Sequence, residues 1–150
     1  MWTGSRVIQE KNLAPEYRTV DAAERIVVAV ADGVAISPYP QKASRLVLEL
    51  LSKELATDTA FDGRLLRRIH GYLCDALAKG KTFGTSTTIV VARYHQEQCS
   101  ILSVGDSRAY HLTAAGELRQ LSRDHTVLNA MIDRGEAAAD KAYASFYNIL

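Results

Sequence analysis

The sequence predicts a layered α/β or α+β domain in which helices pack on a largely antiparallel sheet. Three observations support this. A continuous β-branched run at residues 25–31 is typical of a strand, and two stretches with helical spacing of apolar residues follow it. From residue 85 onward, short apolar segments alternate with turn residues. The length of 150 residues is close to that of one domain, so we expect a single domain over residues 1–150.

Composition and charge exclude several classes of protein. Hydrophobic residues make up 47% and charged residues 23% of the chain, which excludes a disordered or collagen-like chain. The net charge of +1 gives no overall reason to bind nucleic acid or an anionic membrane. The first residues lack the apolar region of a secretory signal, and no apolar run approaches the ~18 residues of a membrane span. We therefore expect a cytoplasmic protein without nucleic-acid or membrane partners.

The two cysteines give no sign of a metal or redox site. Cys74 and Cys99 form no CxxC or Cys/His cluster, so a zinc site or a thioredoxin-like site is not supported. A disulfide framework is not expected either. We expect both residues to be buried small hydrophobic side chains.

The first strand is expected over residues 25–31, after an irregular segment that includes a short strand near residues 6–9. The run of residues 25–31 is continuous rather than alternating, which predicts a strand buried on both faces. The pair Asp32-Gly33 then ends it as a turn.

Two helices are expected next, over about residues 40–56 and about residues 62–79. Each has apolar residues at helical spacing along one side. Asp62 is the expected N-cap of the second helix, and Gly80 is its expected stop.

The remainder predicts an antiparallel meander followed by a helix. A cluster at residues 95–97 and the pairs Gly105-Asp106 and Ala115-Gly116 are turn signals between the strands. A final helix is expected over about residues 125–134, with Asp124 as its cap and Gly135 at its end. The expected strands are residues 85–94, 99–104, 109–112 and 117–121.

Two Asp-Gly or Gly-Asp pairs lie at strand ends and are candidates for a cation site. The Asp32 carboxylate directly follows the first strand, and Gly33 allows a ligand to approach its carbonyl closely. Asp106 likewise follows a strand. Carboxylate and carbonyl oxygens suit Mg²⁺ or Mn²⁺. Taken alone, Asp32-Gly33 is better explained as a plain turn, and Gly105-Asp106 is explained at least as well by a hairpin turn as by a cation site.

Other polar residues have weaker signals. In an extended segment Arg6 and Glu10 would share one face, and an arginine there could bind phosphate bidentately. The cluster of hydroxyls at residues 85–88 is explained by strand propensity. The four histidines show no metal-ligand spacing, and we interpret them as surface or capping residues.

In their order along the chain, four segments resemble the PPM-type (phosphatase 2C-like) metal-dependent protein phosphatases. The sequence Gly-Asp-Ser-Arg-Ala-Tyr at residues 105–110 closely resembles the corresponding motif of that family. The resemblance extends from about Arg6 to Glu136. The segments are Val28-Ala29-Val30-Ala31-Asp32-Gly33, Gly84-Thr85-Ser86-Thr87, Val104-Gly105-Asp106-Ser107-Arg108-Ala109-Tyr110 and Leu121-Ser122-Arg123-Asp124-His125-Thr126.

The resemblance implies an αββα sandwich and a function. The function would be hydrolysis of phosphoserine and phosphothreonine by metal-activated water at a centre of two Mn²⁺ or Mg²⁺ ions. Its substrate would be a phosphorylated protein, partner of a serine/threonine kinase in signalling. By motif position Asp32, Gly33 and Glu10 resemble metal ligands, Asp106 resembles a ligand of a third, weaker metal, and Arg6 resembles the arginine that binds substrate phosphate.

The chain also departs from the family pattern. Lys11 stands where the family has an aspartate, and its ammonium would repel a divalent cation or pair with Asp32. No segment after residue 124 matches the family's later Ser-Asp-Gly and Asp-Asn motifs. We therefore expect the N-terminal part of the domain, an incomplete sandwich that is inactive alone. The alternatives are a catalytically dead pseudophosphatase that binds phosphoproteins or regulates, and a structural domain whose Asp-Gly pairs are only turns.

Overall fold

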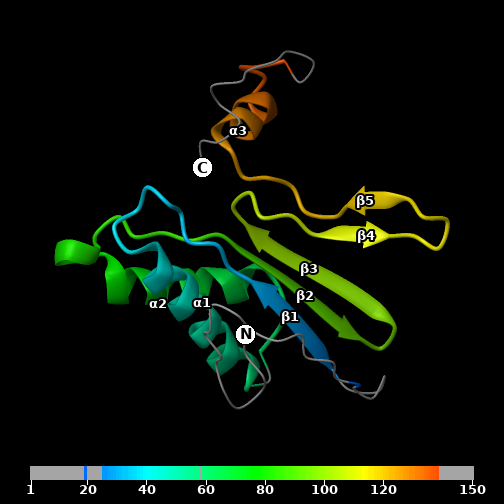
Figure 1. The fold of residues 1–150 in the computed structure, drawn as a ribbon, viewed down its shortest axis with the longest axis horizontal. Coiled ribbons are helices and arrows are strands. Elements are labelled where there is room, and N and C mark those ends of the chain that lie inside the picture. Colours follow the sequence, from blue (N-terminus) through cyan, green and yellow to red (C-terminus); the bar gives the residue numbers. More distant parts are fainter. Residues whose placement is uncertain (1–18, 20–24, 58, 139–150) are drawn as a thin grey trace, which may run out of the picture.

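Two helices follow the first strand and cover one side of an antiparallel sheet (Figure 1). The structure is a computed structural model, and it describes residue 19, residues 25–57 and residues 59–138. The elements are β1 (Ile26–Val30), α1 (Pro40–Leu55), α2 (Gly63–Leu77), the 3-10 turn η1 (Gly80–Thr82), β2 (Ile89–His95), β3 (Gln98–Val104), β4 (Tyr110–Leu112), β5 (Leu118–Gln120) and α3 (Val127–Asp133).

The strands form two sheets rather than one continuous meander. The larger sheet has the order β1-β2-β3 with antiparallel neighbours, and β4 pairs with β5 in a separate hairpin. The prediction of antiparallel pairing is confirmed, but the predicted meander does not run on from β3 to β4. The connection that begins at Gly105 leads the chain away from β3, so β4 cannot continue the ladder; Figure 1 shows the hairpin extending away from the sheet.

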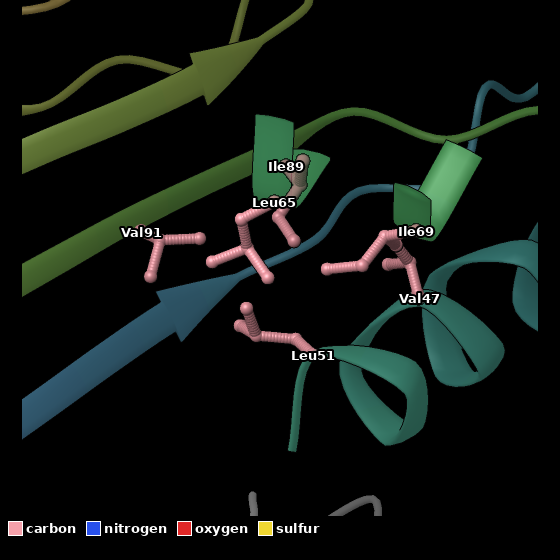
Figure 2. Close-up of a cluster of buried hydrophobic side chains, with 6 residues drawn as sticks. All are labelled: Val47, Leu51, Leu65, Ile69, Ile89 and Val91. Atoms are coloured by element: carbon pink, nitrogen blue, oxygen red, sulfur yellow. The ribbon is translucent and has the colours of Figure 1, made fainter. Parts of the chain in front are cut away.

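The hydrophobic core lies between the two helices and one face of the sheet. Leu65 and Ile69 of α2 meet the side chains of α1 and of β2, as Figure 2 shows. Leu65 and Val91 are fully buried. Alternate residues of a strand point to the same face, which is why Ile89 and Val91 both reach this core. The buried cluster is Val47, Leu51, Leu65, Ile69, Ile89 and Val91.

The opposite face of the sheet is exposed, which corrects the prediction that the first strand is buried on both faces. Val28 and Val30 are 61% and 58% exposed, whereas Val27 and Ala29 pack against the core. A continuous apolar run identifies a strand but does not show whether anything covers its second face. The described residues therefore confirm an α+β arrangement in which helices pack on one face of an antiparallel sheet.

Of the two predicted helix N-caps, one is confirmed and the other is wrong. Asp62 caps α2, its Oδ1 accepting a hydrogen bond of 2.8 Å from the backbone N–H of Arg64, as expected. Asp124 does not cap α3. Thr126 does, its hydroxyl accepting from the N–H of Asn129 at 3.2 Å. The helix ends before Gly135, whose φ of +72° suits a glycine after a helix.

Strand boundaries and the cysteines also differ from expectation. The strand expected from residue 85 begins at Ile89, and residues 86–88 instead bond residues 32–34, which follow β1. The hairpin turn is only Gln96-Glu97, with φ of +50° and +61°. Cys74 and Cys99 are both free and exposed, so their predicted burial is wrong. Cys74 lies on the outer side of α2 and Cys99 on β3, opposite Tyr94.

Candidate functional site

The backbone of Asp32 is fixed by two threonines that precede β2. The N–H of Thr88 donates to the carbonyl of Asp32 at 2.8 Å, and the hydroxyl of Thr87 donates to the same oxygen at 2.9 Å. The N–H of Asp32 donates to the Thr88 hydroxyl at 3.3 Å. The residue's exposure is high, so these bonds hold its main chain while the carboxylate stays open to solvent.

Gly33 has a steric reason to be glycine and an open carbonyl. A Cβ at Gly33 would lie 2.3 Å from the carbonyl oxygen of Pro40, at the start of α1. Gly33 forms an antiparallel bridge with Thr87, and the hydrogen bonds of that bridge are made by the neighbouring residues Asp32 and Val34. In this pattern the bridged residue's own carbonyl points away from the partner. It accepts no hydrogen bond from the described residues and is therefore available to a ligand.

Asp106 is placed by a glycine turn that packs against the same threonine. Gly105 directly follows β3, is buried and has a φ of +100°. A Cβ there would lie 2.6 Å from Cγ2 of Thr88. The Thr88 hydroxyl is 2.6 Å from that of Ser107, so Thr88, only 3% exposed, connects the Asp32 segment to the Asp106 segment.

These segments surround one hollow, which we call the Asp32 hollow. Its volume is about 840 Å³, and both Asp32 and Asp106 line it although they are distant in sequence. His125 lines it too, and its Nδ1 accepts from the N–H of Gly105 at 3.3 Å. The described lining is Asp32, Gly33, residues 34–38, Gly84, residues 86–88, Val104, Gly105, Asp106 and His125.

The described oxygen ligands are of the type that a hard cation prefers, but they are too few to complete its coordination. Two carboxylates and the Gly33 carbonyl are the oxygens that Mg²⁺ or Mn²⁺ prefers. No group of three or more His, Cys, Asp or Glu side chains that could hold a metal occurs among the described residues. An octahedral ion here would therefore need water or residues from outside that part of the chain to complete its coordination.

Three residues that the sequence analysis assigned to the site or its surroundings lie outside the described residues. Arg6, Glu10 and Lys11 are all in this group, as is the short strand expected near residues 6–9. Their expected contributions, phosphate binding by Arg6 and metal binding by Glu10, stay predictions. Of the predicted site residues that are described, Asp32, Gly33 and Asp106 are brought together at the Asp32 hollow.

Sequence reasoning missed the residues that support the acids. The hydroxyls of Thr87 and Thr88 were explained by strand propensity, yet they bond the Asp32 segment. Ser107 and His125 were not predicted as site residues, although both stand inside segments that resemble the family. Those segments were the one available signal, because the contacts themselves join residues far apart in sequence.

Beside the hollow, a charged pair holds the β4 segment to the loop before α3. The Arg108 guanidinium donates to the Asp124 carboxylate, with Nε 2.9 Å from Oδ1 and Nη2 2.5 Å from Oδ2. The hydrogen bonds from Arg108 lower the pKa of the Asp124 carboxyl below its usual value of 3.8. This pairing explains why Asp124 is not the cap of α3.

Comparison with known proteins points to one group of enzymes. The chain is 32% identical over 126 residues to the serine/threonine phosphatase stp of Listeria welshimeri, covering 77% of this chain and 50% of the relative. The chain thus spans about half the length of that relative. No family model matches the sequence.

Solved structures give the same picture at the level of fold. The serine/threonine phosphatase Stp1 from Staphylococcus aureus superposes with a TM-score of 0.68 at 22% identity, over 83% of this chain and 52% of that one. The PPM Ser-Thr phosphatase MsPP from Mycobacterium smegmatis, in complex with cacodylate, gives 0.66 at 23% identity, over 90% of this chain and 61% of that one. The catalytic domain of PstP in complex with two manganese ions gives 0.57 at 23% identity, over 83% of this chain and 58% of that one.

No helix among the described residues combines the length and the apolar composition needed to cross a bilayer.

Proposed function

Because the chain belongs to the PPM-type serine/threonine phosphatase family, which it matches over about 80% of its length, we propose that the Asp32 hollow is part of a phosphoester-hydrolysing centre. Its substrates would be proteins carrying phosphoserine or phosphothreonine that a serine/threonine kinase has phosphorylated in cytoplasmic signalling. One observation carries the proposal: Asp32, Gly33 and Asp106, from two separate segments, line one hollow.

In this proposal the chain's own residues bind and orient. The carboxylates of Asp32 and Asp106 and the carbonyl of Gly33 would hold Mn²⁺ or Mg²⁺. Thr88 keeps the two segments in register, since it bonds both Asp32 and Ser107. When bound, such ions lower the pKa of water and offset the charge of phosphoryl oxygens. Arg6 would bind the substrate phosphate through its guanidinium fork.

The rim of the hollow suits a polypeptide substrate. Residues 34–38 line it, and Ile36 in this loop is 97% exposed. An exposed large apolar side chain beside a polar site gives a peptide's flanking residues a surface to contact. In this proposal Ile36 would contact the residues that flank the phosphorylated side chain of a protein substrate.

A second function is favoured by the small number of carboxylates. With no group of three metal-binding side chains among the described residues, the chain could bind a phosphoprotein without hydrolysing it. Lys11, where the family has an aspartate, favours the same pseudophosphatase reading.

Calorimetry tests the metal site first. Mn²⁺ titrated into the chain should bind, and Asp32→Asn should weaken binding about tenfold or more, since a carboxylate ligand is lost. Asp75→Asn is the matched control, because Asp75 is an exposed acid on α2. Equal affinity of both variants would refute the site.

Phosphate release separates the two functions. With a phosphothreonine peptide, a phosphatase releases inorganic phosphate only when Mn²⁺ is present, and Asp32→Asn abolishes the release. A binding module retains the phosphopeptide over its unphosphorylated form, with or without Mn²⁺, and releases no phosphate. The first result supports the proposed function, and the second replaces it with the alternative.

A further inference from the structure

A second hollow lies at the other end of the sheet from Asp32. Arg25 directly precedes β1 and His95 ends β2, whereas Asp32 follows β1 and Thr88 precedes β2. The second hollow, which we call the Arg93 hollow, has a volume of about 580 Å³. Its described lining is Arg25, Thr59, Ala60, Arg93 and His95.

The strand register explains why three basic side chains meet there. Val27 pairs with Arg93 and Ile26 with Tyr94, so the antiparallel pattern continued by one residue places Arg25 opposite His95. Alternate residues share a face, so Arg93 and His95 lie on the same face as Val91, the face that α1 and α2 cover. The chain joining α1 to α2 closes the hollow through Thr59 and Ala60.

Two polar atoms in this hollow are buried without a partner. Arg93 Nε and His95 Nδ1 have no hydrogen-bond partner among the described residues. Buried polar atoms are rarely left so, because each loses its hydration without compensation. The Arg93 guanidinium is held in place by the Phe61 ring, 4.5 Å from the ring centroid, which leaves its N–H groups for another acceptor.

The charges around the hollow favour an anion. Arg25 contributes a second guanidinium, and its one hydrogen bond within the described ranges is to the carbonyl of Leu55, at 3.4 Å. The acid at the end of α1, Glu54, is paired with Arg68 at 3.0 Å. No carboxylate is found in the described lining. Arg25 and Arg93 carry like charges and line the same hollow, and an oxyanion with several acceptor oxygens would offset both charges and accept hydrogen bonds from the unpartnered groups.

We propose that the Arg93 hollow binds a small phosphate-bearing anion. Arg25 and Arg93 bind its oxygens through their N–H groups, and His95 and the Thr59 hydroxyl supply further donors. Phosphate is preferred over a carboxylate because it offers more oxygens and up to two charges to the two guanidiniums. This site is independent of the Asp32 hollow and needs no metal ion.

The test is a titration of the whole chain with inorganic phosphate in EDTA, followed by amide NMR and calorimetry. We expect saturable shifts at residues 25, 59–60 and 93–95, and weaker binding of acetate. Arg25→Gln and His95→Gln should each weaken phosphate binding, Arg25→Gln by roughly ten- to hundredfold. Using two variants keeps the test valid if one fails to fold.

Controls separate this site from the proposed active site. Arg119→Gln removes an exposed arginine that pairs with Glu117 on the β4-β5 hairpin, and it should not change binding. Asp32→Asn should not change it either, even if Asp32→Asn abolishes Mn²⁺ binding. Equal loss in Arg25→Gln and Arg119→Gln, loss only in Arg6→Gln, or shifts confined to the Asp32 hollow would overturn the proposal.

A parallel titration with free phosphoserine identifies the source of the phosphate group. Binding as tight as that of inorganic phosphate supports a phosphomonoester ligand. Binding of inorganic phosphate alone supports the free anion. Failure of both to bind with saturation would overturn the proposal whatever the activity of the Asp32 hollow.

Discussion

The substitution Gly105→Ala tests how tightly the Asp106 segment is packed on the Asp32 segment. Gly105 has a φ of +100°, and its Cβ would lie 2.6 Å and 2.7 Å from Cγ2 and Cβ of Thr88. Thr88 is 3% exposed and bonded to both Asp32 and Ser107, so it cannot move aside without breaking those contacts.

The cost of this substitution has two parts. A non-glycine residue held at a strained positive φ costs about 1–3 kcal/mol. Overpacking against a buried neighbour costs about 1–3 kcal/mol more. We therefore expect Gly105→Ala to lower the free energy of unfolding by about 2–6 kcal/mol.

Gly116→Ala is the matched control for the backbone part. Gly116 has a φ of +82°, and a Cβ there would meet no atom within 4 Å. Both variants restrict the unfolded chain alike, so that effect cancels in the comparison. Urea denaturation followed by far-UV circular dichroism should show Gly105→Ala to be less stable than Gly116→Ala by about 1–3 kcal/mol. Equal losses would refute the close packing of Gly105 on Thr88.

Three further predictions concern the Arg108–Asp124 ion pair, the hydrophobic core, and Thr88, which joins the Asp32 and Asp106 segments. Asp124→Asn should cost about 1 kcal/mol at pH 7. Arg108 lowers the pKa of Asp124 from 3.8, so this stabilisation is present above pH 3.8 and is lost as the pH falls through the lower, folded-state pKa. The difference in unfolding free energy between wild type and Asp124→Asn should shrink over that acid range, and a constant difference would contradict the pairing. Leu65→Ala should cost about 2–5 kcal/mol in urea denaturation because Leu65 is fully buried, and Val28→Ala less than about 1 kcal/mol; the reverse order would place the core on the other face of the sheet. Thr88→Val should lower the free energy of unfolding by about 1–3 kcal/mol and weaken Mn²⁺ binding in calorimetry, since the valine cannot hydrogen-bond Asp32 or Ser107. Unchanged Mn²⁺ affinity would show that these hydrogen bonds of Thr88 do not position Asp32 and Asp106.

Local chemistry in the sequence predicted much of the fold. Asp62 could be identified as a cap because its partner, the N–H of Arg64, is two residues away. Asp124 could not be assigned in this way, because its partner Arg108 lies 16 residues away and competes with the nearest helix end. Propensity and spacing describe near neighbours and carry little information about such pairs.

In the candidate site too, the sequence predicted features that depend on near neighbours and missed contacts between distant residues. Asp32 and Asp106 were identified because each carboxylate follows a strand end within a family-like segment. Thr88 was not, since a threonine before a strand looks the same whether its hydroxyl faces solvent or, as here, joins segments 56 and 19 residues away. Likewise, the apolar run of β1 does not reveal that Val28 is 61% exposed.

Paramagnetic broadening by Mn²⁺ tests most directly whether Asp32 and Asp106 lie at one cation pocket. Substoichiometric Mn²⁺ broadens amide NMR signals near the bound ion. We expect residues 32–34 and 105–107 to broaden together, and Asp32→Asn to remove both effects at once. Broadening at one segment alone, or at neither while other acids respond, would contradict a shared cation pocket.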